Sequence, residues 1–167
     1  DLREHGRKSL DQLRRDAELI SRDSRIAGVN IGDRVKGLDS FDTVDCGRIA
    51  ADASGKVPLL HLAGKDRAPA QARGVIERAL SQGLENMLLV TGDGILEPRK
   101  DRIRYHESVI AMHEARAMAP GCLLAGAISP FKYREEDLAN QYLKMAKKVN
   151  VGVDYFITNC GWDMGKL

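Results

Sequence analysis

Apolar runs and amphipathic stretches alternate regularly along the chain. Short and nearly continuous apolar runs, such as VPLLHLAG at 57–64, predict buried strands, since the strands of parallel sheets are covered on both faces. Longer stretches with apolar residues three and four positions apart predict helices that pack one face on a sheet. This pattern predicts a first helix ending near residue 23, further helices at 42–53, 68–82, 102–118 and 134–149, and strands at 26–33, 57–64, 86–91, 122–129 and 154–161.

Strands that alternate with helices in this way favour an α/β fold with a parallel sheet. Two architectures fit: an open doubly wound parallel sheet, which five strands complete, and a (β/α)8 barrel of the TIM type, of which about five βα units are present. Counting strands favours the open sheet. No linker or repeat divides the chain, so residues 1–167 are expected to form a single domain.

Polar side chains occur at or near the carboxyl end of each predicted strand. Asn30, His61, Asp93, Ser129 and Asn159 occupy these positions. Both architectures bring the carboxyl ends of their strands to one edge, where ligands bind. The sequence therefore predicts a polar ligand site at that edge.

The tetrapeptide Thr91-Gly92-Asp93-Gly94 follows the most apolar of these strands. Asp-Gly is typical of a turn, because glycine accepts positive φ and aspartate hydrogen-bonds its own backbone. It also suits a ligand-binding carboxylate, flanked by glycines that let a flat molecule approach the backbone. The tetrapeptide alone leaves both interpretations open.

Composition and charge exclude several classes of protein. The 167 residues are 43% hydrophobic, and acidic and basic residues are interspersed with a net charge of +2, which argues against a nucleic-acid-binding protein. No apolar run is long enough for a membrane span. Three separated cysteines without a CxxC pair indicate reduced thiols and a cytoplasmic protein. The histidines have no metal-ligand spacing, so no metal is expected.

Several segments, read together, resemble the methylenetetrahydrofolate reductases, which are flavin-dependent TIM barrels. VPLLHLAGKDR is similar to the third strand of that family, and GLENMLLVTGD to its fourth strand. RYHESV is similar to the start of the next helix, and the segment from AGAIS to TNCGWD to the fifth strand, its helix and the sixth strand. The resemblance implies the (β/α)8 barrel, with the open sheet as the alternative. It also implies an enzyme that reduces 5,10-methylenetetrahydrofolate to 5-methyltetrahydrofolate, with FAD (or FMN) as cofactor and NAD(P)H as hydride source.

The resemblance also implies the roles of individual residues. Asp93 is expected to act in catalysis, beside the flavin and the folate, where a carboxylate stabilises a cationic iminium. Asn159 is expected to bind the folate pterin together with Asp93. The implied flavin-binding residues are Asn30, Ile31, His61, Thr91, Gly92, Asp93, Tyr105, His106, Ser129, Tyr133, Gln141, Lys144, Lys147 and Lys148.

The chain departs from the family pattern in two places. Nothing here corresponds to the first strand of the family, which carries a catalytic glutamate, or to its last two strands. The expectation is therefore the central portion of a longer polypeptide, or a subunit of a homo-oligomer or larger complex. The alternative function is a non-catalytic barrel domain that binds flavin or folate, or a non-catalytic subunit of a larger assembly.

Overall fold

The computed structural model describes residues 6–33, 41–65, 67–92, 106–132, 134–161 and 163–166. Helices and strands alternate through these ranges, as the hydrophobic pattern predicts. The elements are α1 (Gly6–Ser21), β1 (Gly28–Ile31), α2 (Thr43–Ser54), β2 (Val57–Ala63), α3 (Pro69–Ser81), β3 (Asn86–Val90), α4 (Ser108–Met118), β4 (Leu123–Ile128), α5 (Glu135–Asn150), β5 (Tyr155–Thr158) and the 3-10 turn η1 (Met164–Lys166).

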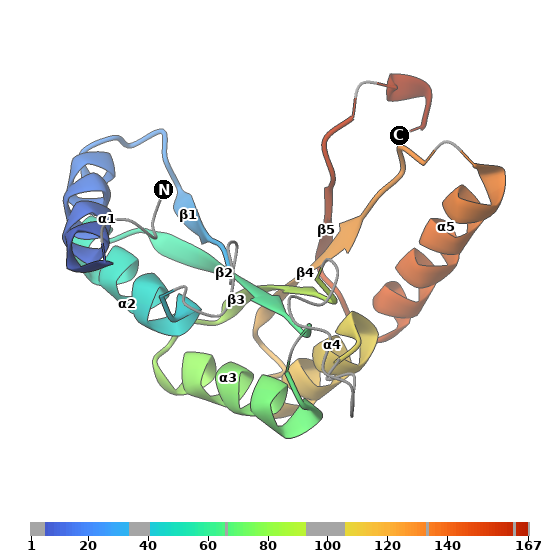
Figure 1. The fold of residues 1–167 in the computed structure, drawn as a ribbon, viewed down its shortest axis with the longest axis horizontal. Helices are drawn as coiled ribbons and strands as arrows, with labels where there is room; N and C mark the ends of the chain where they lie inside the picture. The colour runs from blue at the N-terminus through green and yellow to red at the C-terminus, as the bar shows by residue number, and fades with distance from the viewer. Residues whose placement is uncertain are drawn as a thin grey trace.

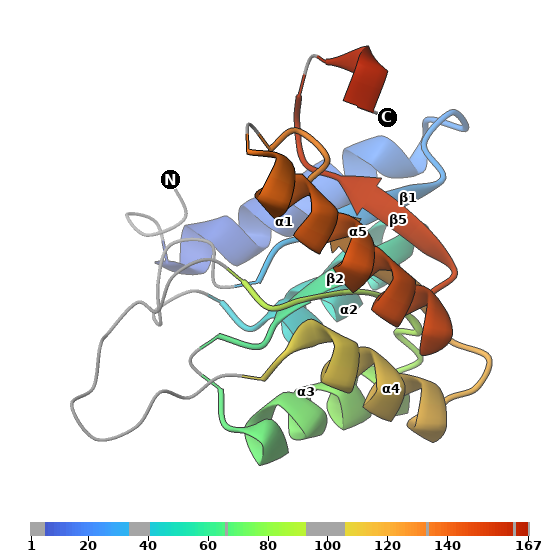
Figure 2. The same cartoon turned by 90° about the vertical axis from the view of Figure 1, so that its right-hand side faces the viewer.

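The five described strands form one parallel sheet in the order β1-β2-β3-β4-β5, which is also their order in the chain. The sheet curls, and the helices cover its outer, convex side, whereas no described helix covers the inner side (Figures 1 and 2). The predicted α/β fold with parallel strands is confirmed. The strand order does not reverse within the sheet, and the curl is that of part of a barrel; an open parallel sheet also describes these five strands.

The main core lies between the convex face of the sheet and the helices. Leu60 and Met87, which are paired in register, are fully buried there, and Met112 of α4 packs in the same cluster. Strand residues one position away point to the concave side, because side chains alternate between the two faces of a sheet. The concave side carries His61 of β2, so the alternation separates the packing residues from the polar ones.

Local capping explains where the helices begin and end. The Asp42 carboxylate accepts hydrogen bonds from the backbone N–H groups of Val44 and Asp45 at the start of α2, and Gly55 ends that helix with φ of 65°. Glu107 caps α4 through Val109 N in the same way, at 2.6 Å. Helix α4 therefore begins at Ser108, later than the predicted residue 102, since Glu107 itself has extended backbone.

No helix within the described ranges is both long enough and apolar enough to cross a lipid bilayer.

Candidate functional site

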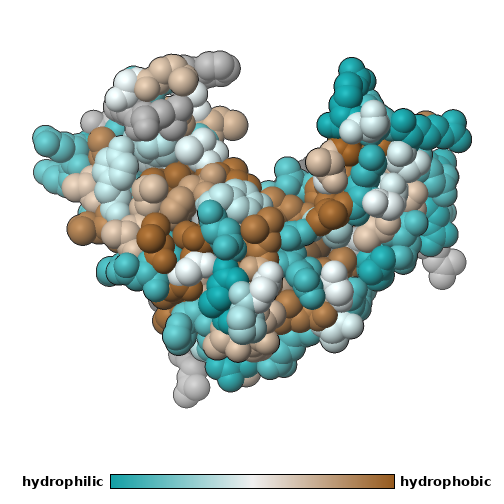
Figure 3. Space-filling view, turned by 180° about the vertical axis from the view of Figure 1, so that it is seen from behind, coloured by the Kyte–Doolittle hydropathy of each residue, from teal (hydrophilic) through white to brown (hydrophobic). Residues whose placement is uncertain are grey.

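A cavity of about 430 Å³ lies at the carboxyl ends of the strands. The molecule is hollowed between its α1–β1 side and its α5–η1 side, with apolar surface at the base of the hollow (Figure 3). Strand residues, the turns after the strands, the start of α4 and one face of α5 all contribute to the lining of the cavity. The lining residues are Gly32, Asp33, His61, Ala63, Lys65, Val90, Thr91, Gly92, Glu107, Ser108, Ala127, Ser129, Gln141, Lys144, Lys148 and Asn159.

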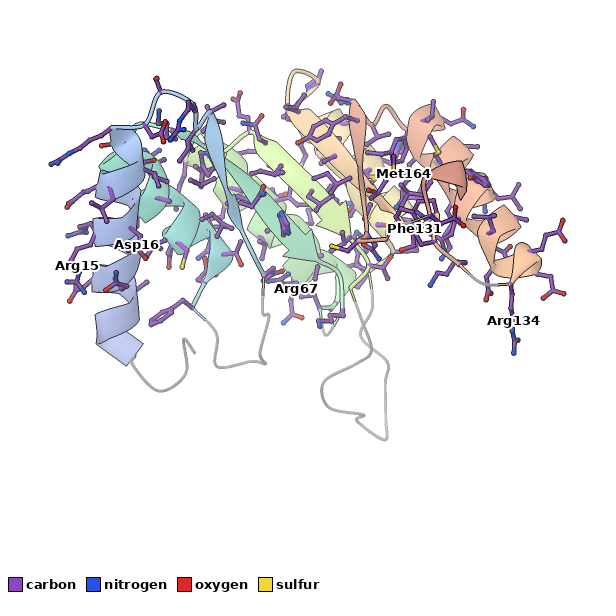
Figure 4. All side chains as sticks on the ribbon, turned by 90° about the horizontal axis from the view of Figure 1, so that it is seen from above. Arg15, Asp16, Arg67, Phe131, Arg134 and Met164 are labelled. Atoms are coloured by element: carbon purple, nitrogen blue, oxygen red, sulfur yellow. The ribbon has the colours of Figure 1, made fainter. Side chains whose placement is uncertain are left out.

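A buried ion pair joins the turns after β1 and β2. Arg67 donates to both carboxylate oxygens of Asp33, through Nη1 to Oδ2 and through Nη2 to Oδ1, and the two side chains are only 7% and 3% exposed. Asp33 also accepts hydrogen bonds from Ala63 N at 2.8 Å and from Thr43 Oγ1 at 3.0 Å. Arg67 lies at the end of the sheet, away from Arg15 and Asp16 of α1 (Figure 4). The pair neutralises the Asp33 charge and fixes this corner of the cavity.

Lys65 follows β2 and contacts the residues that follow β3. Its backbone N–H donates to Thr91 O at 2.9 Å, which extends the pairing of the two strands beyond their last residues. A Cβ at Gly92 would lie 2.9 Å from Lys65 Cδ, and Gly92 has φ of 92°. Glycine is therefore favoured at residue 92 by its backbone conformation, and the lysine stem packs over it.

His61 lines the cavity from β2, on the same face as Ala63 and Lys65. Its Nε2 is buried and has no hydrogen-bond partner among the described residues. Burial lowers the pKa of His61 below the usual 6.5, and the nearby Asp33 carboxylate opposes this shift without cancelling it. The imidazole is therefore neutral at pH 7.

The start of α4 contributes a group of hydroxyls and a carboxylate. The Thr91 hydroxyl lies 3.2 Å from Ser108 Oγ and 3.5 Å from Glu107 Oε1, and Ser108 N donates to Thr91 Oγ1 at 3.4 Å. The Glu107 carboxylate is held by Val109 N, so its charge stays at the first turn of the helix. Thr91 therefore links the end of β3 to the start of α4.

Helix α5 contributes two lysines to the cavity lining. Lys148 is buried, and its Nζ donates to Ala127 O of β4 at 2.6 Å. Its stem occupies space beside Gly126, where a Cβ would come within 3.2 Å of Lys148 Cδ. Burial lowers the pKa of Lys148, the Glu107 charge raises it, and Lys144 lowers it further. Lys144 itself is exposed at the cavity edge.

The ends of β4 and β5 are joined by polar side chains. Asn159 Nδ2 donates to Ser129 Oγ at 2.5 Å, and Ser129 N donates to Gln141 Oε1 of α5 at 3.3 Å. These contacts hold the last strand of the described sheet and α5 against the same turn.

The structure brings many of the sequence-predicted site residues together, and their roles stay predictions. Those that line the cavity are His61, Thr91, Gly92, Ser129, Gln141, Lys144, Lys148 and Asn159. The predicted catalytic residue, Asp93, and the predicted contacts Tyr105 and Tyr133 lie outside the described residues.

Other predicted contacts lie elsewhere. Ile31 packs in the core on the helix side of β1, because its register partner is Leu60 on that face. His106 is 3% exposed, and its Nε2 lies 2.9 Å from Glu114 Oε2 behind the sheet. Asn30 and Lys147 are exposed and do not line the cavity.

Sequence reasoning missed several residues of the cavity: Asp33, Lys65, Arg67 at its edge, Glu107 and Ser108. A signal for Lys65 was present in the spacing. Residues 61, 63 and 65 are two positions apart, so they lie on the same face of an extended segment that continues past Ala63. The Asp33–Arg67 pair joins residues 34 positions apart, and no local pattern indicates it.

The cavity favours an anionic ligand. Lys65, Lys144 and Lys148 contribute positive charge, whereas the Asp33 carboxylate is neutralised by Arg67. Glu107 is then the remaining carboxylate among the described lining residues. Serine, threonine and amide groups surround the lysines and can donate hydrogen bonds to carboxylate or phosphate oxygens. Within the described parts of the chain, no three His, Cys, Asp or Glu side chains are placed to hold a metal ion.

No family model matches the sequence, and no curated protein does. The fold is similar to solved structures at low sequence identity. A protein assigned as a lyase/mutase from Burkholderia cenocepacia J2315 has a TM-score of 0.65 and 16% identity, over 94% of this chain and 59% of that one. A 2,3-dimethylmalate lyase of the PEP mutase/isocitrate lyase superfamily has a TM-score of 0.56 and 10% identity, over 86% of this chain and 52% of that one. The sialic acid aldolase of Ruminococcus gnavus has a TM-score of 0.53 and 13% identity, over 92% of this chain and 48% of that one. The chain thus spans about half to three fifths of these proteins.

These neighbours overturn the resemblance to the methylenetetrahydrofolate reductases, and with it the predicted flavin-dependent reduction of a folate. The physical reason lies in the motifs. A polar residue after an apolar strand, and a glycine before the next helix, are needed by βα barrels of many activities. The flavin, nicotinamide and folate ligands rest on that resemblance alone and lose its support. The neighbours share only the fold with this chain.

Proposed function

We propose that this chain forms part of a βα-barrel enzyme of the carbon–carbon lyase or aldolase type, acting on a small substrate that carries a carboxylate. The observation that carries the proposal is the convergence of Lys65, Lys144 and Lys148 on one cavity at the carboxyl ends of the strands. Ligands bind at this edge in barrels and in open parallel sheets alike.

The names of the structural neighbours support the reaction type. The three neighbours described above are named as a lyase/mutase, a lyase and an aldolase. Reactions of this kind build negative charge on a substrate oxygen, and a cationic cavity with few free carboxylates stabilises such charge. The neutral His61 provides a group that can accept and return a proton at pH 7.

Calorimetric titration with oxalate and with pyruvate tests the proposal. Both anions are expected to bind, and Lys148→Met is expected to weaken both by about tenfold or more, since it removes a charge-assisted hydrogen bond from a buried site. Lys147→Met is the matched control, because Lys147 is the neighbouring lysine but is exposed and lies outside the cavity lining. Equal binding by the two variants, or no binding by the unmodified protein, contradicts the proposal.

A further inference from the structure

Two polar groups on the cavity side of β2 have no partner. Lys65 is 8% exposed, and within the described parts of the chain its Nζ takes part in no hydrogen bond or ion pair. His61 Nε2 is buried and also lacks a partner. Both residues line the cavity, two alternation steps apart on the same face of the extended strand.

The two unpaired groups are available to an occupant of the cavity. Among the described residues, the Lys65 ammonium lines the cavity without an acceptor, and the buried His61 Nε2 lacks a hydrogen bond, which is costly inside a protein. The two carboxylates among the described lining residues are already engaged: Asp33 pairs with Arg67, and Glu107 is held at the start of α4. An occupant of the cavity with an anionic oxygen next to an acidic hydrogen satisfies both groups.

We infer that Lys65 and His61 form the reacting end of the cavity: Lys65 binds the substrate carbonyl oxygen that becomes an enolate, and His61 transfers the proton. This inference rests on the proposed function. The substrate class that fits is a 2-oxo acid with a hydroxyl on the carbon two positions beyond its carbonyl. Its carboxylate is bound by Lys148 and Lys144.

The chemical step balances without a further reagent. His61 Nε2 removes the proton from the substrate hydroxyl, the new carbonyl forms, and the carbon–carbon bond breaks. The bonding electrons move to the 2-oxo oxygen, where the Lys65 ammonium stabilises the enolate. The enolate carbon then takes the same proton back from His61, which gives two carbonyl products and the original neutral imidazole.

Lys65 suits the enolate better than the lysines of α5 do. Lys148 Nζ already donates to Ala127 O, and Lys144 lies at the exposed edge. The Lys65 stem lies over Gly92 at the end of β3, so the side chain enters the cavity from the strand ends. The charged group that acts on His61 is the Asp33 carboxylate from the turn after β1, and Lys65, Lys144, Lys148 and Glu107 line the same cavity.

The first test compares oxalate, a planar mimic of the pyruvate enolate, with lactate, which has a carboxylate but no enolate-like oxygen. The unmodified protein is expected to bind oxalate more tightly than lactate by about tenfold or more. Lys65→Met is expected to remove most of this preference, and Lys65→Arg to keep part of it because the charge remains. Lys148→Met is expected to weaken both anions together and to preserve the ratio.

The second test follows the exchange of the methyl protons of pyruvate in D₂O by NMR, which reports formation of the enolate and proton transfer. His61→Gln is expected to bind oxalate within about threefold of the unmodified protein and to lose the exchange. Lys147→Met is expected to keep both properties.

The outcomes separate the two proposals. If oxalate and pyruvate do not bind at all, the proposed function fails and this inference fails with it. If they bind through Lys148 but the oxalate preference is unchanged in Lys65→Met, or the exchange survives in His61→Gln, only the inference is overturned.

Discussion

The buried Asp33–Arg67 pair is expected to dominate the stability of the cavity. Arg67→Met removes the guanidinium that contacts both oxygens of Asp33 and leaves a carboxylate that is 3% exposed. Removal of one partner of a buried pair costs about 3–5 kcal/mol, because the remaining charge is left uncompensated. Ala63 N and Thr43 Oγ1 still donate to Asp33, so the cost is expected at the lower end of this range, about 3 kcal/mol.

A double-mutant cycle measured by urea denaturation tests this reasoning. Asp33→Asn keeps the shape but leaves Arg67 with a buried charge, and Asp33→Asn/Arg67→Met removes both charges. The double variant is therefore expected to be more stable than the sum of the single losses predicts, by about 2 kcal/mol. The matched control is Arg25→Met at the exposed Asp23–Arg25 pair, where the side chains are 31% and 88% exposed and no measurable loss is expected.

An interaction energy below about 0.5 kcal/mol in this cycle refutes the reasoning, since that value is the scatter between independent sites. The slope of the free energy of unfolding against urea concentration should be the same in all variants, because the substitutions change a single buried contact and not the unfolded chain. A changed slope would mean that the variants alter the unfolded state, and the free energies could then not be assigned to the pair.

Three further predictions follow from the described contacts. Because burial lowers the pKa of Lys148, the unfolded state holds more protons than the folded state between that lowered pKa and the ordinary 10.5. The free energy of unfolding, measured by urea titration, should therefore rise with pH in this window, and the affinity for oxalate, measured by calorimetry, should fall. The contribution of Lys148 to both changes should be absent in Lys148→Met. Gly64→Ala should cost more than about 2 kcal/mol, since its Cβ would lie 1.8 Å from His106 O, whereas Gly74→Ala in α3, with nothing within 4 Å, should gain about 0.5–1 kcal/mol by thermal denaturation. Iodoacetamide at pH 8 should label the exposed Cys160 first, because burial raises the pKa of Cys46 to about 11 and Cys122 is buried; mass spectrometry that found Cys46 labelled first would contradict this order.

The fold could be predicted because its signals are local. The alternation of apolar runs with amphipathic stretches depends on residues a few positions apart, and the order of the strands in the sheet repeats their order in the chain. The start of α4 was predicted too early, at residue 102. The apolar spacing begins before Glu107, but the helix begins only after Glu107 caps it. The strand predicted at 154–161 is shorter in the structure, since β5 ends at Thr158, and Cys160 beyond it is exposed.

The site could be predicted only in part. His61, Ser129 and Asn159 were found because strand ends converge whatever the chemistry. The reason for Gly92 was found only in part: the sequence left open a turn and a flat ligand against the backbone, whereas residue 92 has a positive φ and the Lys65 stem packs over it. Lys147 and Lys148 are adjacent in sequence, and only the packing beside Gly126 decides which one reaches the cavity.

Because the strands pair in chain order, each βα unit docks on the one synthesised just before it. Short-range contacts of this kind form quickly and can form while the rest of the polypeptide is still on the ribosome. The cavity, however, draws on Asp33 near one edge of the sheet and on Asn159 at the other. Its last wall, closed by the hydrogen bond from Asn159 to Ser129, is therefore the part to mature latest, after the units that carry Lys65 and His61 are already folded.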